Sequence, residues 1–391
     1  MPPLVIIGAG QAAAQAVATL RGEGYDGGIV LYGDEPHRPY QRPPLSKAFL
    51  AGESEPGRLE LRPAAFYDDL GVTLRLGVPV AAIDPAAGTV TTAAGITQPY
   101  AKLLITTGTR PRALPLPGDH LAGVHHIRAI RDVERFRAGF RPGARLVVIG
   151  GGYIGLEVAA KARMLGLDVT VVEGQPRILA RVVAAETAAA LAALHAAHGV
   201  ILRTGTGVAG LTGTGSVSGV RLSNGSVLPA DLVLIAVGAV PNVELAASAG
   251  IAVDNGILVD ACTATSLPNI HAAGDVAAFP SRLYGRRIRL ESVPNAIDQA
   301  KAAALALLGR PVRYDPVPWF WSDQYETKLQ IAGLSQGFTE AQTTGEAGSG
   351  PFSVRYLRDG RLIAVDSLND PRSHLQARRE LAAGAERSAA A

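Results

Sequence analysis

The chain has 391 residues, of which 48% are hydrophobic, and a formal net charge of +3, which indicates two or three domains with large cores. This mildly basic balance is not typical of a nucleic-acid-binding protein, and the longest apolar runs are too short to span a membrane. The single cysteine, Cys262, excludes an intrachain disulfide, a cysteine metal cluster and a CxxC redox pair.

The first residues have the pattern of a strand, a glycine turn and a helix start. Residues 4–7 are apolar, Gly8 and Gly10 follow, and Ala13 stands at the third glycine position, where alanine is an accepted variant. The next predicted strand is followed by Asp34. In such a unit the glycines let the backbone reach a pyrophosphate at the helix N-terminus, so this segment predicts a dinucleotide site.

The same pattern recurs later in the chain. Residues 146–149 lead into Gly150, Gly152 and Gly155, and the following strand ends at Glu173, which lies 18 residues past Gly155. A carboxylate at this spacing accepts hydrogen bonds from a ribose 2′-hydroxyl and repels a 2′-phosphate, so we expect NADH rather than NADPH. Two dinucleotide sites in one chain suggest electron transfer between two cofactors.

The remaining elements predict how these units are arranged. Each half closes on an apolar strand ending in glycine, at 103–108 and 232–238, and the strands after Pro241 would return to complete the first domain. We predict an α/β fold with two Rossmann-like domains, the second inserted in the first, and a small α+β C-terminal domain with a hairpin at Asp359-Gly360. The Ala- and Arg-rich tail from Gln376 is expected to fray. The predicted domains are 1–113 with 242–318, 114–241, and 319–391.

Two further segments carry charged or aromatic side chains, and each has an ordinary structural alternative. Residues 42–47 form a stiff, proline-rich loop that ends in Lys47, and Glu157 lies on the helix after the second glycine turn. Residues 319–325 hold both tryptophans of an aromatic-poor chain, including Trp321. From the residues alone, an ordinary proline-rich loop before a helix and an exposed helix residue explain Lys47 and Glu157 better than a functional role does. Core packing explains the tryptophans as readily as a functional role does.

Neither a metal site nor a targeting segment is evident. His195 and His198 have helical spacing but no apparent third ligand, so we predict no metal site. The N-terminus lacks the basic and apolar regions of a signal peptide, so we expect a cytoplasmic protein.

Residues 42–47, 150–157, 291–296 and 319–324 together resemble the FAD-dependent ferredoxin reductases of bacterial oxygenase systems, and the resemblance covers nearly the whole chain. It implies a glutathione-reductase-like fold with non-covalent FAD in the first domain and NADH in the second. It implies FAD contacts from Gly8, Gly10, Ala12, Asp34, Arg42, Lys47, Val80, Thr107, Arg128, Asp275 and Val293. It implies NADH contacts from Gly150, Gly152, Tyr153, Ile154, Gly155, Glu157 and Glu173.

The resemblance also implies a reaction. NADH would deliver a hydride to the flavin, near which Lys47 and Glu157 would face each other. Electrons would then pass singly, by way of Trp321, to a [2Fe–2S] ferredoxin that serves a cytochrome P450 or a ring-hydroxylating oxygenase. We expect a monomer or weak dimer. The ferredoxin would dock near Lys301, Arg310 and Lys328, because opposite charge speeds the encounter of two proteins.

Three alternatives of related fold remain open. One is a rubredoxin reductase. The second is an NADH oxidase or peroxidase, which generally needs a reactive cysteine near the flavin, and residues 41–47 contain none. The third is a redox-controlled interaction protein like apoptosis-inducing factor. Turnover with a ferredoxin separates an enzyme from an interaction protein.

Overall fold

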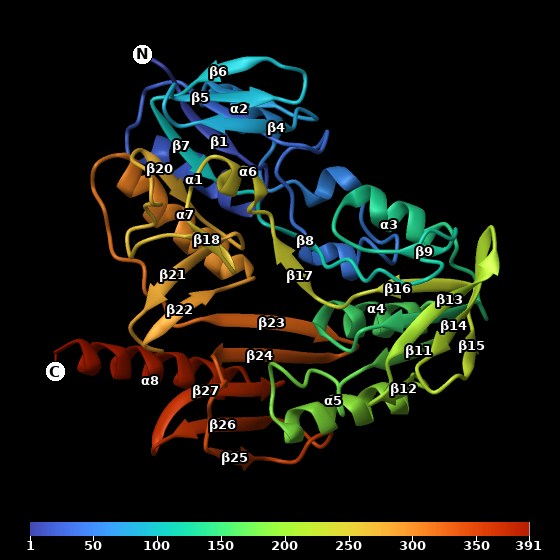
Figure 1. The fold of residues 1–391 in the computed structure, drawn as a ribbon. Coiled ribbons are helices and arrows are strands. Elements are labelled where there is room, and N and C mark those ends of the chain that lie inside the picture. Colours follow the sequence, from blue (N-terminus) through green and yellow to red (C-terminus); the bar gives the residue numbers. More distant parts are fainter. Residues whose placement is uncertain (391) are drawn as a thin grey trace.

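The two predicted nucleotide-binding units form parallel sheets of the same strand order. The structure, a computed structural model, describes residues 1–390, with the side chains of residues 1–384. The first sheet runs β20 (Ile270–Ala272), β7 (Lys102–Ile105), β1 (Leu4–Ile7), β2 (Ile29–Tyr32), β3 (Val72–Arg75). The second runs β9 (Val124–His125), β16 (Leu232–Ile235), β10 (Arg145–Ile149), β11 (Asp168–Glu173), β12 (Ile201–Thr204). Figure 1 shows β1 and β7 of the first sheet and β11 and β12 of the second in separate parts of the molecule.

The central strand of each sheet leads directly into a helix. β1 is followed by α1 (Gln11–Gly22), and β10 is followed by α4 (Tyr153–Met164). Every residue of β1 is buried, as expected for a strand of a parallel sheet that is covered on both faces. A strand that continues into a helix at the carboxyl edge of such a sheet places the glycine turn where nucleotides bind.

The second unit is inserted in the first, as predicted. The chain crosses between the units twice, and the crossing strands β8 (Thr109–Pro111) and β17 (Ala239–Pro241) pair in antiparallel orientation. After the second crossing, β20 returns to pair with β7 of the first sheet. The helix α7 (Val293–Leu307) then packs on α1.

Each unit also carries smaller elements around its main sheet. Antiparallel sheets are formed by β4 (Val80–Asp84), β5 (Thr89–Thr92) and β6 (Thr97–Pro99), and by β13 (Val208–Thr214), β14 (Ser216–Leu222) and β15 (Val227–Pro229). A mixed sheet contains β18 (Val253–Asp254), β19 (Gly256–Leu258), β21 (Ala277–Ser281) and β22 (Arg286–Arg289). The remaining helices before residue 319 are α2 (Ala64–Asp69), α3 (Ile130–Arg137), α5 (Ala185–Ala197) and α6 (Glu244–Ser248), with 3₁₀ turns at Pro43–Ser46 and Pro56–Leu59.

The C-terminal part is an antiparallel sheet covered by a helix. Its strand order is β23 (Trp319–Gln324), β24 (Thr327–Gly333), β27 (Arg361–Leu368), β26 (Phe352–Arg358), β25 (Glu340–Thr344). The edge strand β23 contacts both α4 and α7, so this sheet touches both nucleotide-binding units (Figure 1). The predicted hairpin is confirmed, because Asp359 and Gly360 join β26 to β27 with φ angles of +51° and +70°.

The prediction that the tail frays is wrong for residues 376–390. The chain forms the helix α8 (Pro371–Ala390), whose Ala377 and Leu381 are buried against Ala332 and Val365 of the C-terminal sheet. Alanine favours a helix, and the burial of Ala377 and Leu381 stabilises this one.

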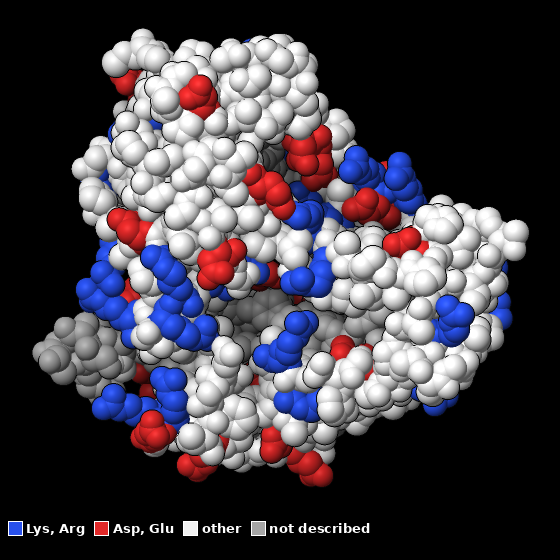
Figure 2. All heavy atoms as spheres, viewed as in Figure 1, with Lys and Arg blue, Asp and Glu red and all other residues white. Residues whose placement is uncertain are grey.

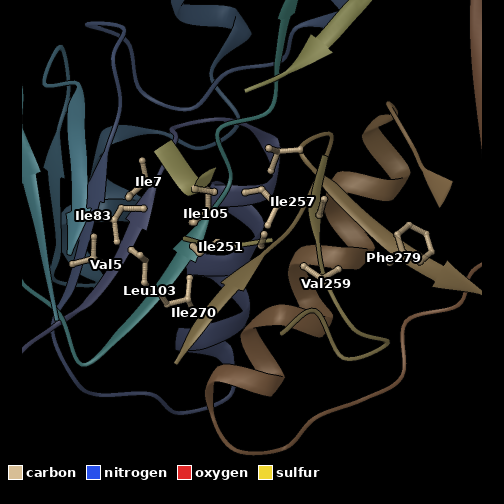
Figure 3. Close-up of a cluster of buried hydrophobic side chains, with 14 of the residues drawn as sticks. Val5, Ile7, Ile83, Leu103, Ile105, Ile251, Ile257, Val259, Ile270 and Phe279 are labelled. Carbon is tan, nitrogen blue, oxygen red and sulfur yellow. The ribbon is translucent and has the colours of Figure 1, made fainter. Parts of the chain in front are cut away.

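The main sheet of the first unit has a core on each face, one against α1 and α7 and one against the mixed sheet. Figure 3 shows Val5, Ile105 and Ile270 on one side, with Ile257 and Phe279 from the mixed sheet on the other. This packing joins segments that precede and follow the inserted unit, so the first unit is completed only after the chain returns. No helix within residues 1–390 is long and apolar enough to cross a bilayer.

Candidate functional site

The two glycine turns have nearly the same geometry. Gly8 and Gly150 have φ angles of +104° and +112°, which favour glycine, and a Cβ atom added there would lie 2.3 Å from the Thr106 carbonyl oxygen and 2.4 Å from the Ala236 carbonyl oxygen. At Gly10 a Cβ atom would meet nothing within 4 Å.

Gly152 matches Gly10, because a Cβ atom there would also meet nothing within 4 Å. Each of these two glycines is the N-cap residue of its helix, and neither helix has a side-chain cap. The first amide groups of α1 and α4 are therefore available to an anionic ligand, and the space in front of them is open.

The residue at the third glycine position of each turn contributes to packing of the following helix. A Cβ atom on Gly155 would lie 2.2 Å from the Gly150 carbonyl oxygen, so glycine lets α4 approach the turn closely. Gly155 does not line either of the two cavities described below, in contrast to the NADH contact that we expected. In the first unit the matching residue is Ala13, which is completely buried in the core beneath α1.

A large cavity begins at the first turn and continues to the C-terminal sheet. The predicted FAD residues along its wall are Gly8, Gly10, Ala12, Asp34, Arg42, Lys47, Thr107, Arg128, Asp275 and Val293. Glu157, Tyr153, Ile154 and Trp321 also line it. Val80 does not line this cavity; it packs against the core of the first unit.

Charged side chains from distant segments meet in this wall. Arg42 donates to Glu35 at 2.8 Å and to the Tyr40 hydroxyl at 3.0 Å, and Tyr40 donates to Glu35 at 2.7 Å. Arg42 also donates to the carbonyl of Arg128. This network fixes the loop before residues 43–47 against the segment that enters the second unit.

Asp275 is a carboxylate in the wall of the first cavity. Its carboxylate lies 3.9 Å from the Arg128 guanidinium, which is too far for a good hydrogen bond, and it faces the cavity. Burial raises the pKa of Asp275, while Arg128 opposes that shift. Burial, with Arg42 nearby, lowers the pKa of Arg128.

These features fit an FAD molecule. The free helix N-terminus at Gly10 suits its pyrophosphate, and an acceptor at Asp275 suits its sugar-alcohol chain. Lys47 and Trp321 at the other end of the cavity provide a cation and an aromatic ring for the flavin end.

A second cavity begins at the second turn. Of the predicted NADH residues it is lined by Gly150, Gly152, Tyr153, Ile154 and Glu173. The Glu173 carboxylate accepts hydrogen bonds from the amides of Gly151 and Gln175, both at 2.8 Å. These bonds hold its oxygens at the end of β11, where an NADH ribose hydroxyl would reach them, so the residues present fit NADH.

The two cavities share part of their walls. Thr109, Arg128, Tyr153, Ile154 and Glu291 line both, and the Ile154 side chain is 50% exposed there. Figure 2 shows a hollow near the middle of this face of the molecule, with lysine and arginine side chains along its rim. Ligands in the two cavities would therefore meet near the start of α4.

Lys47 and Glu157 form an ion pair close to this shared wall. The Lys47 Nζ atom lies 2.5 Å from Glu157 Oε2, and the Ser46 hydroxyl donates to the same oxygen at 2.5 Å. The other carboxylate oxygen, Oε1, accepts from the Ser322 hydroxyl at 2.7 Å. Glu157 is only 6% exposed. A buried carboxylate needs hydrogen-bond donors in place of water, and these three groups supply them. The resemblance pointed to Lys47 and Glu157, but no local pattern pointed to Ser46 or Ser322.

Successive side chains of β23 point to opposite faces of the sheet and therefore make different contacts. The rings of Trp319 and Trp321 lie 5.7 Å apart, and Trp321 lines the first cavity. Phe320 packs on Tyr153 of α4, with ring centroids 4.4 Å apart. Tyr40 and Phe320 are cavity residues that the sequence analysis did not single out.

The three cations expected at a docking surface are each close to a carboxylate. Lys301 lies 3.0 Å from Asp298, Arg310 lies 2.9 Å from Glu23, and Lys328 lies 3.7 Å from Asp323. None of the three lines either cavity. Cys262 is half-buried and also lies outside both cavities.

Comparison with known proteins gives one consistent result. Residues 2–300 match the pyridine nucleotide-disulphide oxidoreductase family, and residues 319–391 match the reductase C-terminal family. Rhodocoxin reductase of Rhodococcus erythropolis is 46% identical, over 97% of this chain and 89% of the relative. A biphenyl dioxygenase system ferredoxin–NAD(+) reductase component of Paraburkholderia xenovorans (strain LB400) is 40% identical, over 94% of this chain and 90% of the relative.

A solved structure agrees with these relatives. The covalent putidaredoxin reductase–putidaredoxin complex contains a chain that matches with a TM-score of 0.94 and 41% sequence identity. The match covers 97% of this chain and 93% of that one.

Proposed function

This chain belongs to the pyridine nucleotide-disulphide oxidoreductase family, and we propose that it is a ferredoxin reductase that carries electrons from NADH to a [2Fe–2S] ferredoxin. It is an oxidoreductase whose cofactors are FAD and NAD(H). The observation that carries the proposal is the shared wall of the two cavities, because it would bring a bound NADH close to a bound flavin, on whose cavity wall Lys47 and Glu157 lie.

Bound FAD supplies the change from two-electron to one-electron transfer, since a flavin accepts a hydride and releases electrons singly. The chain's own residues bind and orient the cofactors. The helix starts at Gly10 and Gly152 would hold the two pyrophosphates, and Asp275 and Glu173 would accept hydrogen bonds from hydroxyl groups of the cofactors.

Lys47 and Glu157 line the first cavity, and Glu157 lies on α4 three residues after the shared residue Ile154. Glu157 is held from both sides by hydroxyl groups, so it fixes the Lys47 ammonium at the cavity wall. A fixed cation there would stabilise negative charge on a bound flavin without reorganisation.

The test of this pair is the rate of flavin reduction by NADH in stopped flow. Lys47→Ala should slow reduction by about 100- to 1,000-fold, as for the loss of one fixed electrostatic contact, and should leave FAD bound. Lys161→Ala is the matched control, because Lys161 lies on α4, has similar exposure and pairs with Glu53 outside both cavities. Equal rates for the Lys47→Ala variant and the wild type would remove the pair from the mechanism.

Trp321 is the proposed start of the electron exit. It lines the FAD cavity on β23, away from the NADH cavity, which it does not line. Trp321→Ala should lower the rate of ferredoxin reduction more than the rate of ferricyanide reduction. A role in packing alone predicts equal losses with both acceptors.

The acceptor and the setting follow from the relatives. Rhodocoxin reductase and the biphenyl dioxygenase component are named for different electron-transfer systems, so we propose a ferredoxin of a cytochrome P450 or a ring-hydroxylating oxygenase, acting in the cytoplasm. Lys301, Arg310 and Lys328 remain proposed docking cations because their side chains are about half exposed.

Steady-state turnover is the test of the whole proposal. Purified protein should reduce a [2Fe–2S] ferredoxin with NADH. Reduction of oxygen alone, at the same rate with or without ferredoxin, would favour an NADH oxidase instead.

A further inference from the structure

A line of buried hydrogen bonds reaches Glu157 from the side opposite Lys47. Ser322 donates to Glu157 Oε1 at 2.7 Å, and the Ser322 hydroxyl oxygen accepts from Gln324 Nε2 at 3.2 Å. The Gln324 amide oxygen lies 2.9 Å from His195 Nε2. Ser322, Gln324 and His195 all have 0% exposure, so water does not compete for these bonds.

The partners fix the direction of every bond in this line. An amide oxygen can only accept, so His195 carries its proton on Nε2 and donates to Gln324. His195 Nδ1 is buried without a partner among the described residues. Burial lowers the pKa of His195, which keeps the ring neutral near pH 7. Each donor in the line therefore points toward the Glu157 carboxylate.

Three elements supply the line. His195 lies on α5, Gln324 and Ser322 lie two residues apart on β23, and Glu157 lies on α4. Side chains two residues apart on a strand share a face, and this face is opposite to the one that carries Trp319 and Trp321. The same strand thus presents Trp319 and Trp321 on one face, and Ser322 and Gln324 beside Phe320 on the other.

We infer that Ser322, Gln324 and His195 are positioning residues that hold the Glu157 carboxylate, and through it the Lys47 ammonium, in the orientation needed at the flavin. Without the Ser322 hydroxyl, Oε1 loses its only donor in the described structure while Oε2 keeps two. The carboxylate would then rotate, and Lys47 would follow it. The inference rests on the proposed role of Lys47 in hydride transfer.

Two variants break the line and one variant is a matched control. Ser322→Ala removes the last donor, and Gln324→Met removes both hydrogen-bonding groups with little change in volume. Ser367→Ala is the control, because Ser367 is a buried serine of the same sheet whose hydroxyl has no partner among the described residues.

The first readout is the reactivity of Lys47 toward acetic anhydride, measured by mass spectrometry on the holoprotein. Lys161 serves as an internal reference, since the two lysine side chains are 22% and 20% exposed. Acetylation of Lys47 relative to Lys161 should rise at least about threefold in Ser322→Ala and Gln324→Met, because a loosened ion pair frees the amine. It should not change in Ser367→Ala.

The second readout is the rate of flavin reduction at saturating NADH. It should fall about tenfold in both line variants, as expected for a lost hydrogen bond to a charged group, with an unchanged NADH dissociation constant. Unchanged labelling and an unchanged rate in a folded line variant would overturn the inference. Equal effects in Ser367→Ala would also overturn it, and where one line variant does not fold the other decides. Failure of the wild type to reduce ferredoxin would contradict the proposed function but would leave the labelling result intact.

Discussion

The two cavities start from the same glycine turn but are built differently beyond it. The first is walled by charged side chains from separate segments, including Arg42, Arg128 and Asp275, and it continues to the C-terminal sheet. The second is lined by strand ends and turns of the inserted unit and by the exposed segment around Arg181 and Val182, and it does not reach the C-terminal sheet. A cavity that also contacts the C-terminal sheet suits a cofactor that stays bound, whereas a cavity without that contact suits a coenzyme that exchanges in each turnover.

Substitutions at the third position of each glycine turn compare the two units and have the largest expected effect on stability. A Cβ atom on Gly155 would lie 2.2 Å from a backbone oxygen, so Gly155→Ala must displace α4 and should destabilise the protein by about 4–5 kcal/mol or prevent folding. Ala13→Gly at the matching position should cost only about 1 kcal/mol, the helix propensity difference. Thermal unfolding of both variants measures the contrast, and similar melting temperatures would show that the helices approach their turns equally.

The wall of the second cavity depends on the C-terminal sheet. Asp366, which is 1% exposed, accepts a hydrogen bond from the Tyr356 hydroxyl, and that hydroxyl accepts from the Ala184 amide at 2.8 Å. Ala184 ends the segment that includes Arg181 and Val182. Burial raises the pKa of Asp366 to about 7.

The next prediction compares the free energy of unfolding of the wild type and of Asp366→Asn as a function of pH. Because the folded-state pKa is above the unfolded value, the folded protein holds an extra proton between about pH 4 and pH 7. Wild-type stability relative to the variant should fall as the pH rises through this window, by up to about 4 kcal/mol. Urea unfolding at pH 5 and pH 8 measures the difference, and parallel pH profiles would contradict a titrating Asp366.

Local patterns predicted the two turns, because the glycines and the following carboxylate are close in sequence. The sequence also predicted the insertion, from the strand pattern after Pro241. It could not predict the surroundings of Glu157, since Ser46 and Ser322 come from loops and strands more than 100 residues away on either side. Val80 was carried over by resemblance alone, and its packing in the core gives it no contact with the described cavity wall.

Coenzyme choice has the smallest expected effect. Glu173→Ala should narrow the preference for NADH over NADPH by about 1–3 kcal/mol, because it removes repulsion of the 2′-phosphate and an acceptor for the 2′-hydroxyl. The measurement is kcat/KM for both coenzymes. Glu186→Ala, a change on the exposed side of α5 outside both cavities, is a suitable control. A wild type that already favours NADPH would contradict the role of Glu173.

The central claim is that the first cavity keeps FAD bound while the second exchanges NADH. Gly10→Ala and Gly152→Ala test it most directly, because each adds one methyl group to an open turn where it meets no protein atom within 4 Å. After gel filtration, Gly10→Ala should have lost most of its FAD, while Gly152→Ala should keep FAD at the wild-type ratio and show a raised dissociation constant for NADH. Loss of FAD from Gly152→Ala, with full retention by Gly10→Ala, would contradict the assignment of the two cavities.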